Sequence, residues 1–196
     1  MSRPDIKACK AGLRRELREQ RRSLPARARQ QSNTALCRHL LHSSWFQLSR
    51  NIAVYCATDG EISLHVLATA ARRAGKKLYL PCVEGRRKMQ FYRWTCSTPL
   101  QRNSLGILEP AVRGRPLAGI HLDLVLIPLV GFDSRGRRLG MGGGYYDRYF
   151  AHLGQRGQRP WLFGVAHSFQ QRERIPQGRR DRRLHGVVTE TGLRRF

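Results

Sequence analysis

The sequence predicts an α/β fold in which a mostly parallel sheet is covered by helices. Residues 123–129 form a short, almost continuous apolar run, which is typical of a central strand buried on both faces. Residues 51–57, 61–74 and 77–83 have the patterns of strand, helix and strand, the order of a parallel crossover. The chain, residues 1–196, is long enough to bury a sizeable core, and we expect it to form a single domain.

Two helices are predicted before the first strand. Residues 5–24 have an amphipathic pattern with a dense basic surface. Three apolar side chains share one side of this predicted helix: Ile6, Leu13 and Leu17. A start signal at Ser23 and Pro25 then introduces a second helix that ends near His42, which we interpret as structural.

The remaining elements follow from turns and apolar runs. The helix over residues 61–74 follows directly on a Thr-Asp-Gly turn and ends before Gly75, a typical helix stop. Its predicted inward side chains are Ile62, Val66 and Ala70. Residues 89–95 alternate and are aromatic, which fits a strand at the margin of the sheet. Further strands are expected at residues 161–167 and 187–190, the second being the last of the sheet.

The composition is strongly basic, with 37 Lys and Arg against 13 Asp and Glu and a formal net charge of +24. A field of that sign attracts polyanions such as nucleic acids and nucleotides, but it does not choose among them. The five cysteines are scattered without a C-x-x-C pair, which indicates reduced thiols. No membrane-length apolar run or secretion signal is present, so we expect a cytoplasmic protein without a membrane partner.

The most informative stretch is residues 131–150, where the predicted central strand passes into a glycine-rich loop. Residues 142–144 are consecutive glycines, and a helix is predicted from Tyr145 to His152. Glycines let several backbone N–H groups point into one concavity and attract an anion. Neither common nucleotide signature fits, because G-x-x-x-x-G-K-[ST] lacks its lysine and Tyr145 replaces the last glycine of G-x-G-x-x-G. The loop predicts a phosphate site of another kind; a plain surface connection is the alternative.

This loop resembles the signature of the 5-formyltetrahydrofolate cyclo-ligases, also called 5,10-methenyltetrahydrofolate synthetases. The resemblance rests on Gly131-Phe132-Asp133, Gly136, Arg138-Leu139-Gly140 and Gly142-Gly143-Gly144-Tyr145-Tyr146-Asp147. In weaker form it runs from about Lys10 to Gly192. That family closes 5-formyltetrahydrofolate to 5,10-methenyltetrahydrofolate using ATP and magnesium. The resemblance implies a single-domain, three-layer sandwich with a Rossmann-like sheet, as in sugar-phosphate isomerases and CoA transferases.

The resemblance implies a nucleotide site made by the loop and the N-terminal helix. Lys10, Leu13 and Arg14 match a K-x-x-L-R pattern whose lysine and arginine reach the ATP phosphates in the family. The implied ATP-binding residues are Lys10, Arg14, Arg138, Leu139, Gly140, Met141, Gly142, Gly143, Gly144, Tyr145 and Tyr146. Many members have an arginine where this chain has Met141, whose apolar side chain can contact folate but cannot pair with phosphate.

The resemblance also implies a folate site and a magnesium site. Glu61 matches an acidic residue that contacts the pterin ring; a helix N-terminal acid favoured by the macrodipole is its alternative reading. The implied substrate-binding residues are Cys56, Glu61, Met141 and Tyr145, although Cys56 could equally be a small buried residue without function. Asp147 and Asp181 match the magnesium pair, with a salt bridge to neighbouring arginines as the alternative for Asp181.

The reaction implied by the resemblance needs no protein nucleophile. The formyl oxygen on N5 would attack the γ-phosphate to give an imidate-like phosphate, and N10 would then attack the activated carbon as phosphate leaves. The protein would supply positioning and charge stabilisation, with Arg138 and Tyr145 as the implied catalytic residues.

Two rival functions stay open at this point. One is a basic nucleic-acid-binding protein, against which the lack of common RNA-module motifs counts. The other is a different enzyme on a similar sheet. If the protein is instead a cyclo-ligase, as the resemblance implies, we expect a monomer whose partners are ATP and 5-formyltetrahydrofolate, including its polyglutamylated forms.

Overall fold

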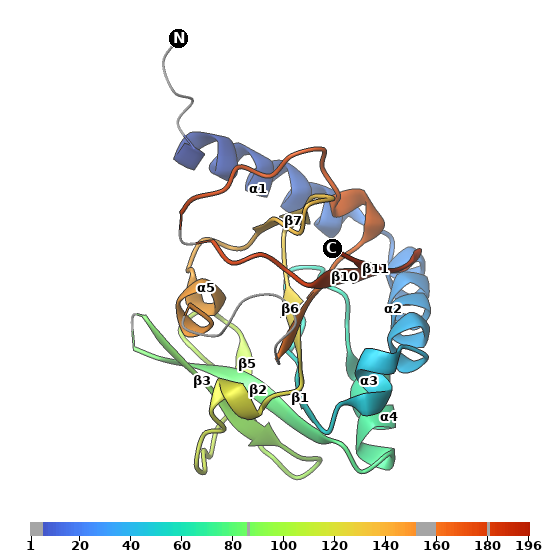
Figure 1. The fold of residues 1–196 in the computed structure, drawn as a ribbon, viewed down its shortest axis with the longest axis vertical. Coiled ribbons are helices and arrows are strands. Elements are labelled where there is room, and N and C mark those ends of the chain that lie inside the picture. The colour runs from blue at the N-terminus through green and yellow to red at the C-terminus, as the bar shows by residue number, and fades with distance from the viewer. Residues whose placement is uncertain (1–5, 86, 152–159, 180) are drawn as a thin grey trace.

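The computed structural model describes residues 6–85, 87–151, 160–179 and 181–196, and a seven-stranded sheet forms its centre (Figure 1). The strand order is β11-β10-β9-β6-β1-β2-β3. The bounds are β1 Asn51–Ala53, β2 Lys77–Glu84, β3 Lys88–Trp94, β6 Leu124–Pro128, β9 Trp161–Val165, β10 Gly186–Thr189 and β11 Gly192–Arg195. The central strands from β10 to β2 are parallel, and β3 and β11 are antiparallel at the edges. The predicted α/β class is confirmed.

Helices and two small hairpins complete the described part of the chain. The helices are α1 Ile6–Ser23, α2 Ala26–Leu41, α3 Ser44–Leu48, α4 His65–Arg73 and α5 Tyr145–Tyr149, with 3₁₀ turns at Gly119–His121 and Ser168–Gln170. The hairpins pair β4 Leu100–Arg102 with β5 Leu108–Pro110, and β7 Gly131–Phe132 with β8 Arg138–Leu139. Within these residues no helix is long and apolar enough to cross a membrane.

The central strand β6 is buried on both faces, as its apolar run predicts. Leu124 and Leu126 join the core on the face covered by α2, α3 and α4. Val125 and Ile127 alternate with them and join the core on the opposite face, where Phe150 at the end of α5 packs. This arrangement follows from the period-2 alternation of side chains in a strand.

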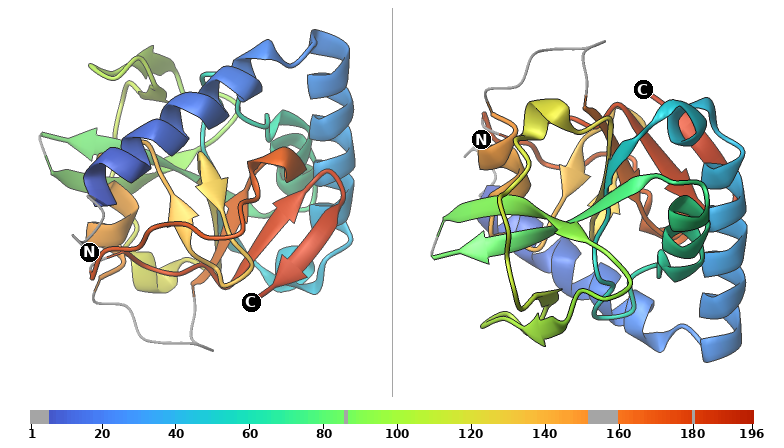
Figure 2. Two further views of the ribbon diagram at one scale, coloured as in Figure 1. Left: turned by 90° about the horizontal axis from the view of Figure 1, so that it is seen from above. Right: turned by 90° about the horizontal axis from the view of Figure 1, so that it is seen from below.

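Helix α1 lies across the carboxyl end of the parallel strands, over β7 (Figures 1 and 2). Of the three apolar residues predicted to share one side of this helix, Ile6 at its start is 45% exposed. Leu17 is fully buried and packs in a small apolar cluster with Val130 and Ile175. Spacings of four, three and four residues put Lys10, Arg14 and Arg21 on the same face as Leu17, so the inner face of α1 is largely basic.

The start of α4 was predicted four residues too early. The helix begins at His65, and Glu61 lies in the preceding non-helical segment. A tertiary hydrogen bond holds that segment out of the helix: the Ser63 N–H donates to Asn33 Oδ1 at 2.9 Å and not to a carbonyl of a preceding helical turn. The inward side chains are therefore not the predicted Val66 and Ala70 but Leu67, Ala68 and Ala71.

Several other expected bounds also change. The strand predicted over residues 51–57 ends at Ala53, and the one predicted over 161–167 ends at Val165. The strand over 187–190 is not the last, because β11 follows it at the sheet edge. Helix α5 ends at Tyr149, and the expected end at His152 and the connection at 154–159 lie outside the described residues. The marginal position of β3 is confirmed.

Candidate active site

The glycine-rich loop leaves the carboxyl end of β6, where ligands bind in open parallel sheets. Asp133, which is fully buried, shapes the loop from inside. Its Oδ1 accepts the N–H groups of Arg135 at 2.9 Å and Arg137 at 3.1 Å, and its Oδ2 accepts the N–H of Ile175 at 3.0 Å. The Gly-Phe-Asp part of the signature is therefore a structural support for the residues that follow.

The three consecutive glycines form a bare backbone surface next to helix α5. Gly142 and Gly144 have positive φ angles of 106° and 63°, which side chains rarely adopt. A Cβ on Gly143 would lie 2.7 Å from a ring carbon of Tyr145. Side chains at these positions would strain the loop or fill the space over its amides, so glycine is needed at each of them.

One pair of charged residues joins α1 to the segment before β10. The ammonium group of Lys10 lies 2.5 Å from Asp181 Oδ2, which also accepts the N–H of Gly178 at 2.8 Å. Burial alone would raise the pKa of Asp181, but these two donors outweigh it and hold that pKa below its ordinary value. Arg14 donates to the carbonyl oxygen of Gly140 at 2.8 Å, so Arg14 reaches the loop while Lys10 reaches the segment before β10.

A second pair lies at the start of α5. Arg138, whose side chain is 5% exposed, donates to Asp147 Oδ1 at 2.6 Å and to the carbonyl of Arg182 at 2.5 Å. The same Asp147 oxygen accepts the Arg182 N–H at 2.9 Å. The charge of Arg138 also lowers the pKa of Asp181, so the two pairs form one cluster. The fold thus brings together Lys10, Arg14, Arg138, Asp147 and Asp181.

The two carboxylates of this cluster could hold magnesium only together with oxygen atoms from a bound phosphate or from water. Within the described ranges, no group of three or more His, Cys, Asp or Glu side chains could hold a metal ion. The hydrogen bonds described for Asp147 fall on Oδ1 and those for Asp181 on Oδ2, leaving each carboxylate a second oxygen. Magnesium is usually held by one or two carboxylates together with phosphate oxygens and water, and this pair fits that pattern.

The predicted folate residue Glu61 takes no part in these ion pairs and instead lies 3.7 Å from the Arg21 guanidinium of α1. Its Oε2 accepts the N–H of Thr58 at 3.0 Å, and its side chain is 10% exposed. Burial raises the pKa of Glu61 above its ordinary value. Burial and Glu61 raise the pKa of Tyr146 well above its ordinary range, whereas Arg138 acts in the opposite direction. Tyr146 therefore lies within electrostatic reach of both Glu61 and the charged cluster. Because Glu61 precedes α4, its alternative reading as a helix N-terminal acid is wrong.

The other predicted substrate residues lie around this end of the sheet without joining the ion pairs described above. Met141 is 53% exposed beside the glycines. The Tyr145 ring faces the Arg148 guanidinium at 5.1 Å. Cys56 is half-buried after the carboxyl end of β1, and burial raises the pKa of its thiol, which makes it a weak nucleophile.

Two residues near Glu61 were not identified from the sequence. Arg21 is 1% exposed, and Asp59 forms ion pairs with Arg18, Arg21 and Arg22. The hydrogen bonds from these arginines outweigh the effect of burial and lower the pKa of Asp59 to about 2. The available signal was that Arg21 falls on the same helical face as Leu17, a position at which an apolar residue is expected.

The Asp59 ion pairs predict acid sensitivity. A carboxyl group with a lowered folded-state pKa stabilises the protein above its unfolded value of 3.8, and that stability is lost as the pH falls toward about 2. In the D59N variant the free energy of unfolding should vary less with pH over this window. Urea unfolding of both proteins between pH 2 and 5 checks it; parallel pH profiles would contradict it.

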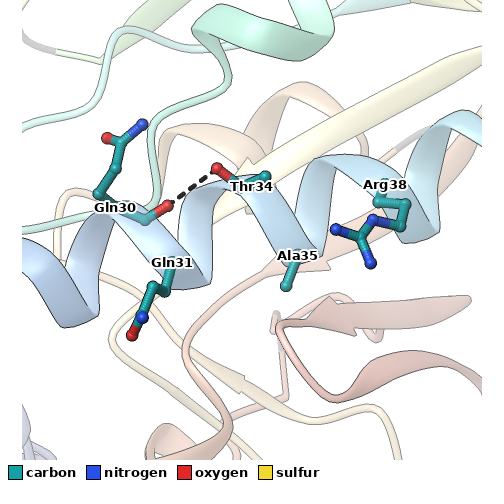
Figure 3. Close-up of a pocket in the computed structure, with 5 residues that line it drawn as sticks. All are labelled: Gln30, Gln31, Thr34, Ala35 and Arg38. Atoms are coloured by element: carbon teal, nitrogen blue, oxygen red, sulfur yellow. Dashed lines mark hydrogen bonds between the residues drawn. The ribbon is translucent and has the colours of Figure 1, made fainter.

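A shallow hollow of about 320 Å³ lies elsewhere, on the outer side of α2 (Figure 3). It is lined by Gln30, Gln31, Thr34, Ala35 and Arg38. The hydrogen bond drawn there is the Thr34 hydroxyl donating to the carbonyl of Gln30, an ordinary contact within a helix. Of these five residues only Arg38 is charged, and α2 lies well apart from α5 and the glycine loop before it (Figures 1 and 2).

The sequence and the fold were compared with known proteins. The model of the 5-formyltetrahydrofolate cyclo-ligase family matches residues 6–190. A 5-formyltetrahydrofolate cyclo-ligase of Haemophilus influenzae is 35% identical over 167 residues, covering 84% of this chain and 88% of that protein. The Escherichia coli enzyme of the same name is 32% identical over 176 residues, covering 88% and 96%.

The solved structures that this fold resembles are also 5,10-methenyltetrahydrofolate synthetases. The 5,10-methenyltetrahydrofolate synthetase of Aquifex aeolicus superposes with a TM-score of 0.82 at 33% identity, covering 95% of this chain and 92% of that one. A 5,10-methenyltetrahydrofolate synthetase of Mycoplasma pneumoniae has a TM-score of 0.74 at 22% identity, covering 92% and 98%, and shares the fold.

Proposed function

Since the chain belongs to the 5-formyltetrahydrofolate cyclo-ligase family, we propose that the charged cluster around Arg138 and the glycine loop together form its active site. The protein is an enzyme of folate one-carbon metabolism, a ligase that forms 5,10-methenyltetrahydrofolate from 5-formyltetrahydrofolate. The observation that carries the site proposal is that two basic residues of α1 reach this region from far away in the sequence. Arg14 contacts Gly140, 126 positions away, and Lys10 contacts Asp181, 171 positions away.

ATP is the proposed co-substrate. Its phosphates are anionic, and the bare amides of residues 142–144 beside Lys10, Arg14 and Arg138 provide donors and positive charge of the kind that bind phosphate. Arg138 is held by Asp147 and by the carbonyl of Arg182, so its guanidinium is oriented before the nucleotide arrives.

Asp147 and Asp181 are the proposed magnesium ligands. Each has one carboxylate oxygen engaged with a described donor and a second one for the ion. A bound magnesium ion would neutralise charge on the phosphates. Lys10 would keep Asp181 ionised, and Arg138 would hold Asp147 in a fixed orientation for the ion.

The folate is proposed to lie between Glu61 and the loop. A buried, ionised carboxylate can accept two N–H bonds from the pterin ring, and the exposed Met141 side chain can cover an apolar part of the substrate. Tyr145 and Cys56 would complete the walls. The basic surface would favour polyglutamylated forms of the substrate, whose tails carry added negative charge.

In the proposed reaction the formyl oxygen on N5 attacks the γ-phosphate, and ADP leaves. N10 then attacks the activated formyl carbon and loses its proton, the ring closes, and inorganic phosphate departs as the C–O bond breaks. The side chains contribute position and charge: Glu61 orients the pterin, while Lys10 and Arg138 stabilise the charge that develops on the transferred phosphoryl group. No residue of the chain has to form a covalent intermediate.

The test is the absorbance band of 5,10-methenyltetrahydrofolate after the protein is mixed with 5-formyltetrahydrofolate, ATP and magnesium. We expect the band to grow only when ATP is present. Folded protein that binds ATP without forming the band would contradict the proposal.

The single-domain organisation and the monomeric state remain predictions, which proteolysis and sedimentation would check.

A further inference from the structure

Arg21 is a buried cation at the far end of α1 from Lys10. Its Nε donates to the carbonyl of Asp59 at 2.7 Å, and its Nη2 donates to the Asp59 carboxylate at 2.8 Å. Its Nη1 donates to the carbonyl of Leu129 at 3.3 Å and lies 3.7 Å from Glu61 Oε1. One guanidinium therefore links α1, the exit of β6 and the turn that carries Glu61.

The turn itself is packed directly against α1. Asp59 and Gly60 both have positive φ angles, of 51° and 77°. A Cβ on Gly60 would lie 2.8 Å from the backbone oxygen of Arg21, and a ring nitrogen of His167 lies 3.3 Å from the Gly60 carbonyl on the other side. The turn is thus fixed from two sides, and Arg21 supplies two of the four described hydrogen bonds that α1 donates to Asp59.

Building on the proposed function, in which Glu61 contacts the pterin, we propose that Arg21 is a positioning residue for the folate substrate. It fixes the turn at Asp59 and Gly60 and holds the Glu61 carboxylate ionised in one orientation. It does not reach the ATP side of the site, which belongs to Lys10 and Arg14 nearer the start of the same helix.

The charges around Glu61 explain why it needs this neighbour. Glu61 faces Arg21 from α1, Asp59 from its own turn, Tyr55 from the segment after β1 and Tyr146 from α5. Burial favours the neutral acid and Asp59 acts in the same direction, whereas Arg21 favours the carboxylate. Arg21 is the cation in this group, so its removal should leave Glu61 protonated up to a higher pH.

The experiment compares R21Q and R21K with R22Q. Arg22 also binds Asp59, but its side chain is 52% exposed and no contact with Glu61 is described for it, so R22Q is a matched control. For R21Q we expect the KM for 5-formyltetrahydrofolate to rise about tenfold or more, with the KM for ATP within about twofold of the parent value. The acid limb of kcat/KM for the folate should move to higher pH. R21K, which keeps the charge, should restore much of the pH profile, and R22Q should behave like the parent.

A double-mutant cycle separates positioning from general stability. If Arg21 acts through Glu61, R21Q should add little to the loss of folate binding already caused by E61Q. A full, additive loss in that background, or a parent-like folate KM in folded R21Q, would overturn the inference. If R21Q does not fold, R21K takes its place. A lysine cannot make the forked contacts with Asp59 and Leu129, so its folate KM should still rise, and a parent-like folate KM in R21K would also overturn the inference. Failure of the proposed function is distinct, since the parent protein would then form no methenyl product.

Discussion

Replacing Arg138 by alanine should lower kcat by about 10²–10³-fold, the usual consequence of removing one preorganised donor from a transition state that develops charge. Arg138 is almost fully buried, and its two hydrogen bonds, to Asp147 and to the Arg182 carbonyl, fix it before the substrate binds. Its loss removes a positive charge from the proposed position of phosphoryl transfer, and it also releases Asp147. Single-turnover formation of the methenyl band measures the chemical step directly.

Arg135 provides the matched control for this experiment. It lies in the same loop but is exposed, so R135A should retain the parent rate. R138K keeps the charge but not the planar fork, and an intermediate rate is expected. Thermal unfolding of R138A distinguishes a folded, inactive enzyme from an unfolded one. A folded R138A with more than about a tenth of the parent kcat would contradict the assigned role.

Replacing Asp147, the proposed magnesium ligand, by asparagine should lower kcat/KM by at least about 10²-fold, the consequence of losing a metal contribution of several kcal/mol. Asparagine retains an oxygen that can accept from Arg138 and from the Arg182 N–H, so the hydrogen bonds persist while the negative charge disappears. The magnesium concentration that gives half-maximal rate should rise. Titration of magnesium at fixed ATP measures both effects.

The control for D147N is E173Q, which neutralises an exposed acid outside the cluster. It should leave the magnesium dependence unchanged. If D147N required no more magnesium than the parent protein, the metal role of Asp147 would be wrong, and the residue would only hold Arg138 in place.

The sequence predicts the sheet better than it predicts what covers it. The runs that become β6 and β2 are apolar enough to fix their type and position, and the parallel pairing of β1 with β2 follows from the helix between them. The start of α4 was wrong because the bond between Ser63 and Asn33 depends on contacts distant in the sequence. β11 was missed because it lies at an edge, where burial imposes only a weak pattern.

In the candidate site, too, residues in a local sequence pattern could be predicted, whereas contacts between distant parts of the chain could not. Residues of the glycine loop could be proposed from the sequence because their pattern is local, and a family resemblance supplied Lys10, Arg14 and Asp181 as further candidates. The pairing of Lys10 with Asp181 spans 171 positions, and no pattern in the sequence specifies it. Arg21 was hidden among 37 basic residues, since only its position in the fold distinguishes it from solvated arginines.

Helix α1 is attached to the rest of the molecule in an unusual way. Apart from Leu13 and Leu17, its contacts with the domain include the ion pairs of Lys10 and Arg21 and the bond from Arg14 to the loop. Salt screens the partly exposed ion pairs of Lys10, Arg18 and Arg22, whereas the apolar contacts and the buried pair of Arg21 depend little on ionic strength. Both proposed binding regions depend on this one rigid element. In kinetic terms, we therefore expect movement of α1 to loosen nucleotide and folate together, so that release of the two products is coupled and becomes faster as the salt concentration rises.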